Sequence, residues 1–204
     1  MTRARALTAA FTLLWVAAIA TGFAALLDFD NRPGDAGEPP AAWPDGTALA
    51  RRDGLPTLIM GLHPHCPCSR ASLAELERIV ARCRGRVQPL ILLHAPAGAG
   101  LDWTLTDIRS RAASIHGVVL VTDLGGVESD RFGLRTSGHV LYYDSGGLLR
   151  FSGGITASRG HEGDSAGGRI ILSLIDKMDR TIADAGIAPV FGCPLEERDA
   201  CNRK

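Results

Sequence analysis

The segment TLIMGLHPHCPC, residues 57–68, joins a short apolar run to a pair of cysteines. Pro56 and Pro64 bound the apolar part, and this pattern is typical of a short buried β-strand. Two histidines and two cysteines then fall within residues 63–68, with only prolines between them. We therefore expect a group of reactive or metal-binding side chains directly where a buried strand ends.

Helix and strand patterns alternate along the rest of the chain. Apolar residues at helical spacing predict a helix over residues 67–84, which Gly85 ends. The later predicted elements are a strand over 87–94, a helix over 102–116 with Asp102 as N-cap, a strand over 118–123, a helical turn over 128–133, a hairpin of HVLYYD and LLRF, and an amphipathic helix over 169–185. This order predicts an α/β domain in which helices flank a central mixed sheet.

The N-terminal residues predict a membrane anchor. Residues 6–27 are 22 residues without a charge, and a helix needs about 20 apolar residues to cross the hydrocarbon core. Arginines precede this run and aspartates follow it, so the positive-inside rule places the N-terminus in the cytoplasm. A signal peptide cleaved near residues 22–24 is the alternative. Both readings export the domain, and we expect a single-pass protein of a bacterial inner membrane that faces the periplasm.

Composition divides the chain into four predicted parts. Residues 1–27 form the anchor, residues 28–54 a linker rich in Pro, Gly and Asp, residues 55–186 the domain, and residues 187–204 a C-terminal tail. Trp43 in the linker either packs on the domain or belongs to a loosely ordered tether. The formal net charge is zero and no long basic run is present, which argues against a nucleic-acid partner.

The cysteine pair lies where a helix is expected to begin. Pro67 suits the first helical position and favours extended dihedrals for the residue before it, which are the dihedrals of an N-cap. Cys66 is therefore predicted to cap the helix and Cys68 to lie in its first turn. Unpaired N–H groups and the helix dipole at that end favour a thiolate, which is the reactive form in disulfide exchange. A disulfide between the two would close a small, strained ring.

A metal site is the alternative interpretation of the same residues. His63, His65, Cys66 and Cys68 offer soft and borderline ligands suited to copper(I) or zinc, although their spacing is tighter than in a zinc finger. His161, in a charged loop after the hairpin, is a candidate third ligand or proton shuttle, or simply part of a solvated loop. Two buried, unreactive cysteines are the remaining possibility. The redox interpretation needs no cofactor, whereas this one implies copper or zinc.

The strand LIMGLH, the Cys-Pro-Cys junction and the segment RFGLRTSGHVLYYDSGGLLRFSGGIT together resemble thioredoxin-like proteins. The resemblance covers residues 55–185. It is closest to the membrane-anchored, peroxiredoxin-like branch that assists cytochrome maturation or handles periplasmic thiols, and within it to a RedB-like group. It implies a thioredoxin-like fold with an inserted αβ unit over residues 102–123.

Two departures from that family concern its active site. The family carries CxxC, whereas this chain has CxC in Cys66-Pro67-Cys68. The family also has a cis-proline before the strand that faces the cysteines, and the equivalent place here holds Gly138, preceded by Ser137. The resemblance implies that Ser137 and Gly138 present their backbone to an extended substrate. Loss of the proline that shields the cysteines favours the metal interpretation.

Three further cysteines complete the set. Cys83 lies on the apolar face of its predicted helix and is expected in the core. Cys193 and Cys201 in the tail are predicted to pair with each other, with a Cys193 partnership to Cys66 as the alternative. The sequence thus predicts a membrane-tethered periplasmic thiol–disulfide oxidoreductase acting on protein thiols and disulfides, with Cys66 as nucleophile and Cys68 as resolving thiol. The alternative is a metallochaperone-like module that binds copper or zinc.

Overall fold

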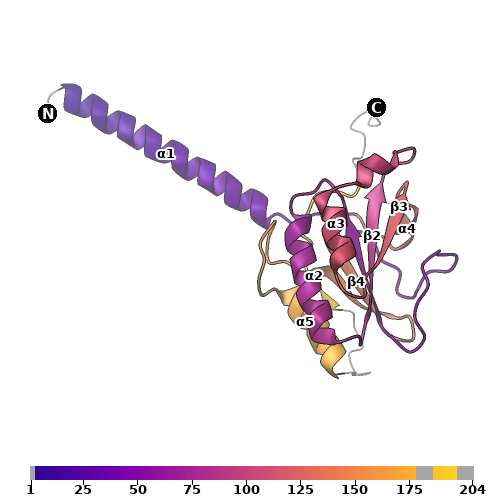
Figure 1. Ribbon diagram of the computed structural model, residues 1–204. Coiled ribbons are helices and arrows are strands. Elements are labelled where there is room, and N and C mark those ends of the chain that lie inside the picture. Colours follow the sequence, from indigo (N-terminus) through magenta and orange to yellow (C-terminus); the bar gives the residue numbers. More distant parts are fainter. Residues whose placement is uncertain (1–2, 178–185, 197–204) are drawn as a thin grey trace. The chain divides into compact units, whose positions relative to one another are not determined.

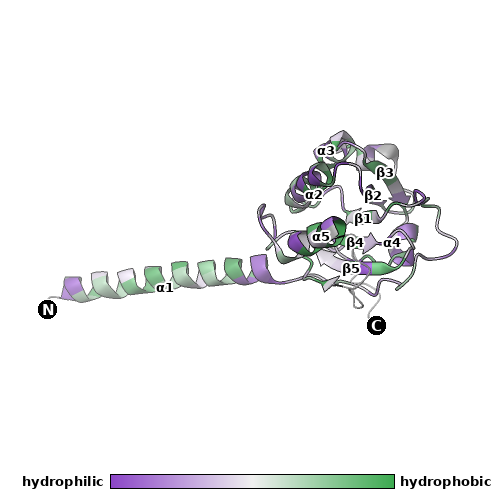
Figure 2. Cartoon of the chain, turned by 90° about the horizontal axis from the view of Figure 1, so that it is seen from below, coloured by the Kyte–Doolittle hydropathy of each residue, from purple (hydrophilic) through white to green (hydrophobic). Residues whose placement is uncertain are grey.

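The computed structural model describes residues 3–177 and 186–196, and the chain divides into two compact units at residues 32 and 33 (Figure 1). The first unit is the helix α1, Arg3–Asn31. It is long and apolar enough to cross a membrane, a property that an N-terminal signal sequence shares. Figure 2 shows the apolar residues along most of its length, with hydrophilic residues at both ends. The predicted helix is confirmed, and it continues four residues past its predicted end.

The second unit is built on a six-stranded mixed sheet. Its strands are β1 Thr57–Leu62, β2 Gln88–Ala95, β3 Val119–Leu124, β4 His139–Tyr143, β5 Leu149–Gly154 and β6 Gly186–Ile187. Their order in the sheet is β3-β2-β1-β4-β5-β6. Strands β1, β2 and β3 run parallel, whereas β4 is antiparallel to both β1 and β5. Every residue of β1, β2 and β4 is buried, which explains their continuous apolar sequences.

Two apolar clusters cover the two faces of this sheet. Helices α2 Ser69–Cys83, α3 Asp107–Ser114 and α5 Ala166–Lys177 pack on one face (Figure 1). Phe132 and Leu134, which follow the short helix α4 Val127–Arg131, pack on the other face together with residues before β1, including Leu49. A mixed sheet with flanking helices is therefore confirmed.

The helix boundaries differ most from prediction in the inserted unit over residues 102–123, and the last helix begins at Ala166, three residues before its predicted start. The single helix expected over residues 102–116 is two elements, the 3-10 turn Leu101–Thr104 and the helix α3. Thr106, and not Asp102, is the N-cap of α3, because its hydroxyl accepts a hydrogen bond from the Arg109 amide. The end predicted for the last helix, residues 178–185, lies outside the described residues.

The segment predicted as a linker packs on the domain over residues 33–54. The Trp43 ring lies edge-on against Phe132 and Tyr143, with centroid distances of 5.0 and 5.4 Å. The carboxylate of Glu128 accepts a hydrogen bond from the Ala48 amide at 3.1 Å. The high content of Pro, Gly and Asp predicted a tether. The contacts of Trp43 and Ala48 show that residues 33–54 also pack against the domain.

Candidate active site at the end of strand β1

Between β1 and α2 the chain makes two tight turns. The Cys66 amide donates to the His63 carbonyl, and the Ser69 amide donates to the Cys66 carbonyl, both at 3.1 Å. Helix α2 begins at Ser69, and Cys68 is its N-cap, with φ −66° and ψ −22°. The prediction that Cys66 caps the helix is wrong, because the second turn places Cys66 before the helix begins. Cys66 lies in the loop that leads from the buried strand to the helix N-terminus.

Three thiols meet at this place. The Cys66 and Cys193 sulfurs lie 3.0 Å apart, although 127 positions separate them in the chain. Cys68 also interacts with the Cys66 sulfur, and all three cysteines are free thiols. Cys66 is 1 % exposed, whereas Cys68 and Cys193 are half-buried. Cys83 lies in the core between sheet and helices, as predicted.

Hydrogen bonding makes Cys66 the thiolate of this group. A hydrogen bond from the Cys193 side chain lowers the pKa of Cys66 to about 5, against the opposing effect of burial. The Ser69 side chain and the Cys193 backbone act in the same direction. The same shared proton raises the pKa of Cys193. Burial, followed by the charge of Cys66, raises the pKa of Cys68. Of the three sulfurs, Cys66 is therefore the one that ionises most readily.

Ser137 and Gly138 lie beside the cysteines, but their backbone amides already have partners. The Ser137 amide donates to the Cys193 carbonyl at 2.8 Å, and the Gly138 amide donates to the Gly61 carbonyl at 2.8 Å. Gly138 has φ +88°, and a Cβ there would lie 2.6 Å from the Ser72 hydroxyl. Its place in the fold therefore excludes proline, which fixes φ near −65°. Of the two predicted backbone contacts, only the Ser137 amide faces an extended segment, and that segment belongs to this chain.

The Ser137 side chain organises the loop that carries the thiols. Its hydroxyl accepts a hydrogen bond from the His63 amide at 2.9 Å and lies 2.8 Å from the Ser69 hydroxyl. Ser137 and Ser69 are both about 1 % exposed. These bonds hold the start of the turn and the start of α2 to the loop before β4, so Cys66 is fixed between them.

Cys193 reaches Cys66 because residues 188–196, which we call the tail segment, fold back over the sheet. Thr136 and Pro194 form an antiparallel bridge, and the Leu195 amide donates to the Arg135 carbonyl at 2.9 Å. The predicted local pair, Cys193 with Cys201, includes a residue outside the described ones. The described partner of Cys193 is Cys66, which was the alternative.

Arg159 is a functional candidate that sequence reasoning passed over. Its guanidinium donates to the Gly192 carbonyl of the tail segment. Its charge also acts to lower the pKa of Cys68, although burial outweighs it. His161 was singled out from the same loop, yet its ring is exposed and its Nδ1 contacts the Arg159 carbonyl. The positive charge of Arg159 was visible in the sequence and could have identified this residue as a candidate, because arginine stabilises nearby thiolates.

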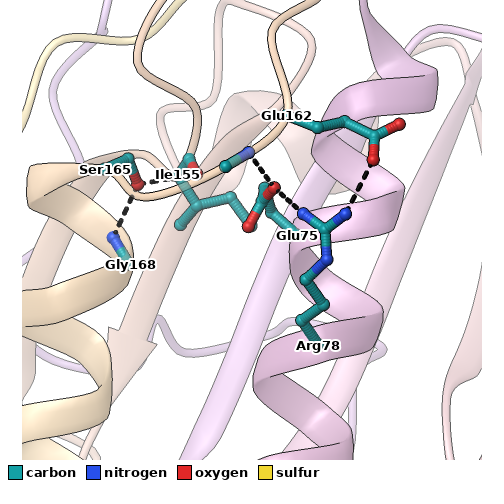
Figure 3. Close-up of polar contacts among 7 residues, drawn as sticks. Glu75, Arg78, Ile155, Glu162, Ser165 and Gly168 are labelled. Atoms are coloured by element: carbon teal, nitrogen blue, oxygen red, sulfur yellow. Dashed lines mark hydrogen bonds and ion pairs between the residues drawn. The ribbon is translucent and has the colours of Figure 1, made fainter.

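The loop that carries Arg159 is anchored to α2. The Glu75 carboxylate accepts hydrogen bonds from the Gly163 amide at 2.6 Å and from the Arg78 guanidinium, as Figure 3 shows. Arg78 also pairs with Glu162 at 2.8 Å. Glu75 is 8 % exposed, so its bonds are largely shielded from water. This network fixes the loop that leads from β5 to α5, and with it the position of Arg159.

The predicted metal ligands do not form a metal site within residues 3–177 and 186–196. No three His, Cys, Asp or Glu side chains there are arranged to hold an ion. The rings of His63 and His65 instead pack against Trp103, with centroid distances of 5.4 and 4.7 Å. The His63 ring also stacks on His94 at 6.1 Å. These imidazoles form an aromatic group beside the cysteines, and His161 lies on the separate loop after β5.

Comparison with known proteins supports the fold. No protein-family model and no curated protein sequence matches the chain. An uncharacterised conserved protein from Geobacillus kaustophilus matches with a TM-score of 0.52 and 16% identity, covering 83% of this chain and 94% of that one. A hypothetical protein from Sinorhizobium meliloti matches with a TM-score of 0.57 and 16% identity, covering 80% and 93%.

Among the other matches is a secreted Mycobacterium tuberculosis disulfide oxidoreductase homologous to DsbE of E. coli, with a TM-score of 0.43 and 13% identity, covering 61% of this chain and 83% of that one. The parallel strands β1 and β2, the antiparallel β4 and β5, and the cysteines between β1 and α2 follow the arrangement that the sequence predicted. The chain therefore has a thioredoxin-like fold, with three thiols grouped at the end of its strand β1.

Proposed function

We propose that this chain is a membrane-tethered thiol–disulfide oxidoreductase of the periplasm in which Cys66 is the nucleophile. The observation that carries the proposal is the 3.0 Å contact of the Cys66 sulfur with a second thiol, in a site that holds Cys66 as a thiolate. A thiolate that lies beside a free thiol has what disulfide exchange requires. The membrane-anchored, RedB-like branch and the periplasmic location are part of this proposal.

The reaction proceeds by two exchanges at the Cys66 sulfur. The thiolate attacks one sulfur of a substrate disulfide, an S–S bond forms to Cys66, and the other substrate sulfur leaves with the electron pair and takes a proton. A second thiol of the chain, Cys68 or Cys193, then attacks Cys66 and releases the first substrate sulfur. The substrate gains two electrons and two protons, and the chain is left with a disulfide. The reverse sequence oxidises a substrate dithiol.

Protein thiols and disulfides are the proposed substrates. The Ser137 amide lies next to the thiols, and a donor in that position binds an extended peptide through its backbone. Backbone pairing accepts many sequences, because it does not depend on the side chains of the peptide. Cys66 is only 1 % exposed, so the residues that cover its sulfur must move before a substrate can reach it.

Copper or zinc binding is the second interpretation of these residues, and it has weaker support. Cys66 and Cys68 offer soft sulfur ligands. Cys193 lies beside them, but among residues 3–177 and 186–196 no three His, Cys, Asp or Glu side chains are arranged to hold an ion. Titration of the reduced chain with zinc or copper(I) distinguishes the two. Stoichiometric binding that Cys68→Ser abolishes, without disulfide turnover, would support metal handling.

The proposal is tested by following reduction of a disulfide-linked fluorescent peptide by the full chain in detergent micelles, with dithiothreitol as electron source. Cys66→Ser is expected to abolish turnover, because a hydroxyl does not exchange with disulfides. Cys83→Ser is the matched control, since Cys83 lies in the core and burial raises its pKa. Equal activity of the two variants would contradict the assignment of Cys66.

A further inference from the structure

The tail segment is fastened along its whole described length. The Ala188 amide donates to the Ser152 carbonyl at 3.2 Å, and the Val190 carbonyl accepts from the Gly34 amide at 2.8 Å. At the other end, the Leu195 side chain is buried among the apolar residues on the face of the sheet that Trp43 covers. Contacts on both sides of Cys193 therefore define where its sulfur lies.

At its centre the tail segment occupies the position expected of an extended substrate. The Cys193 carbonyl accepts the Ser137 amide at 2.8 Å, and Pro194 bridges to Thr136 in antiparallel register. The Cys193 sulfur lies 3.0 Å from the Cys66 sulfur. A substrate peptide bound through Ser137, with its cysteine at Cys66, would make this pair of contacts.

Glycine at position 192 permits this close approach. A Cβ on Gly192 would lie 1.9 Å from the Ser137 carbonyl oxygen, a backbone atom that has no freedom to move aside. The Gly192 carbonyl in turn accepts a hydrogen bond from Arg159. A glycine and a part-buried hydrogen bond directly before Cys193 therefore allow the tail segment to lie against Ser137.

Cys193 has a geometric advantage over Cys68 as a partner for Cys66. One residue separates Cys66 from Cys68, so a disulfide between them closes a small ring through Pro67, and Cys68 has helical dihedrals. Cys193 arrives on a separate segment, and its sulfur approaches Cys66 without such a ring. Formation of the Cys66–Cys193 bond needs only a small closing movement of the two side chains.

We propose that Cys193 is the redox partner of Cys66 and that the tail segment is an internal substrate mimic, which leaves when a substrate binds and returns to resolve the mixed disulfide. This inference rests on the proposed function, because it concerns the second thiol of the same reaction. Substrate and tail segment compete for the Ser137 amide and for the Cys66 sulfur.

The resolving step is balanced within the chain and its substrate. After the first exchange, Cys66 carries the substrate in a mixed disulfide and no longer holds a negative charge. The returning Cys193 loses its proton and attacks the Cys66 sulfur, so the Cys66–Cys193 bond forms and the bond to the substrate breaks. The electron pair leaves on the substrate sulfur, which takes up the proton. A dithiol reductant restores both thiols.

Disulfide mapping of the full chain in detergent micelles tests this pairing. Trypsin releases Cys66 and Cys68 together in residues 53–70, Cys193 in residues 181–198 and Cys201 in residues 199–203. After equilibration in oxidising glutathione buffer and alkylation, we expect a cross-link between the first two peptides. We expect Cys68→Ser to retain this cross-link and Cys193→Ser to lose it together with steady-state turnover.

Three other patterns would overturn the inference. One is peptide 53–70 lacking two hydrogen atoms while Cys193 is alkylated, with turnover intact, which would leave the proposed function standing and make Cys68 the partner. Another is a cross-link between peptides 181–198 and 199–203, which would pair Cys193 with Cys201. If Cys66 stays a thiol in every buffer and no turnover occurs, the proposed function fails as well.

A second variant tests whether the tail segment must lie against Ser137, and it leaves every thiol in the chain. Gly192→Ala forces the segment away from Ser137, so the hydrogen bonds to Ser137 and Arg159 are lost. Two hydrogen bonds correspond to a shift in occupancy of roughly thirtyfold. At about pH 8, where Cys66 is ionised with or without the bond from Cys193, we expect the rate of Cys66 alkylation by iodoacetamide to rise by about that factor. Formation of the Cys66–Cys193 bond should become slower. Gly100→Ala is the control, since nothing lies within 4 Å of a Cβ there and its φ of −68° suits alanine. Equal alkylation rates in wild type and Gly192→Ala would refute the mimic.

Discussion

Replacing Cys193 by alanine is expected to raise the pKa of Cys66. The side-chain hydrogen bond from Cys193 is the largest cause of the low Cys66 pKa, and burial is the main opposing effect. Removal of the donor leaves burial opposed only by the weaker bonds from the backbone and from Ser69. A hydrogen bond to a charged group contributes roughly 1.5–3 kcal/mol, which corresponds to about 1–2 pKa units.

The assay is the rate of Cys66 alkylation by iodoacetamide between about pH 4 and pH 9, because only the thiolate reacts. Cys68→Ser and Cys201→Ser in the background leave Cys66 as the reactive thiol. In the parent, Cys66 stays ionised down to about pH 5, so the rate falls only below that value. In Cys193→Ala the fall is expected about 1–2 units higher. The midpoint in the parent belongs to the pair, since the two sulfurs share one proton.

Cys193→Ser is the matched control for this experiment. Its hydroxyl keeps a donor at the same place, so the midpoint is expected to move less than in Cys193→Ala. An unchanged midpoint in Cys193→Ala would refute the view that this hydrogen bond sets the pKa of Cys66. Equal shifts in both variants would mean that displacement of the tail segment, and not the donor, is responsible.

Two further predictions concern stability, measured by urea unfolding of the full chain in detergent micelles. Burial lowers the pKa of His139 to about 4. The unfolded chain therefore takes up a proton at this residue as pH falls below about 6.5, and the free energy of unfolding drops by up to about 3 kcal/mol by pH 4. His139→Leu should make the free energy of unfolding depend less on pH, and an unchanged pH dependence would contradict the assignment. Trp43→Ala should cost about 2 kcal/mol through lost packing on Phe132 and Tyr143, with Trp43→Phe as the milder control; no effect would mean that residues 33–54 are only a tether.

Patterns of neighbouring residues predicted the main elements correctly. Period and length alone located the apolar N-terminal helix, the three parallel strands and the hairpin of β4 and β5. They were less reliable at the ends of elements, where single hydrogen bonds decide. The Ser69 amide bonds to the Cys66 carbonyl and delays the helix, and the Thr106 hydroxyl starts α3 after a separate turn.

The candidate site was predicted only in part. Cys66 and Cys68 were identified because a CxC junction at the end of a strand is visible in the sequence. The sequence did not reveal that the Ser137 and Gly138 amides are already occupied, because both donate to carbonyls that lie far away in the chain. Arg159 was missed for the same reason, since its partner is the Gly192 carbonyl. Backbone groups are alike in every residue, so such pairs leave no mark in composition or spacing.

The sequence by itself determined an N-terminal helix long enough for a membrane, an α/β order of elements, and a pair of cysteines at a strand-to-helix junction. These follow from local periodicity and from the dihedral limits of proline. Only the tertiary structure decided which thiol faces Cys66. Cys193 lies 127 positions away, and its place depends on backbone hydrogen bonds and on a glycine that lets two chain segments touch. Those contacts exist only once the sheet has formed and brought residues 135–137 and 193–195 together.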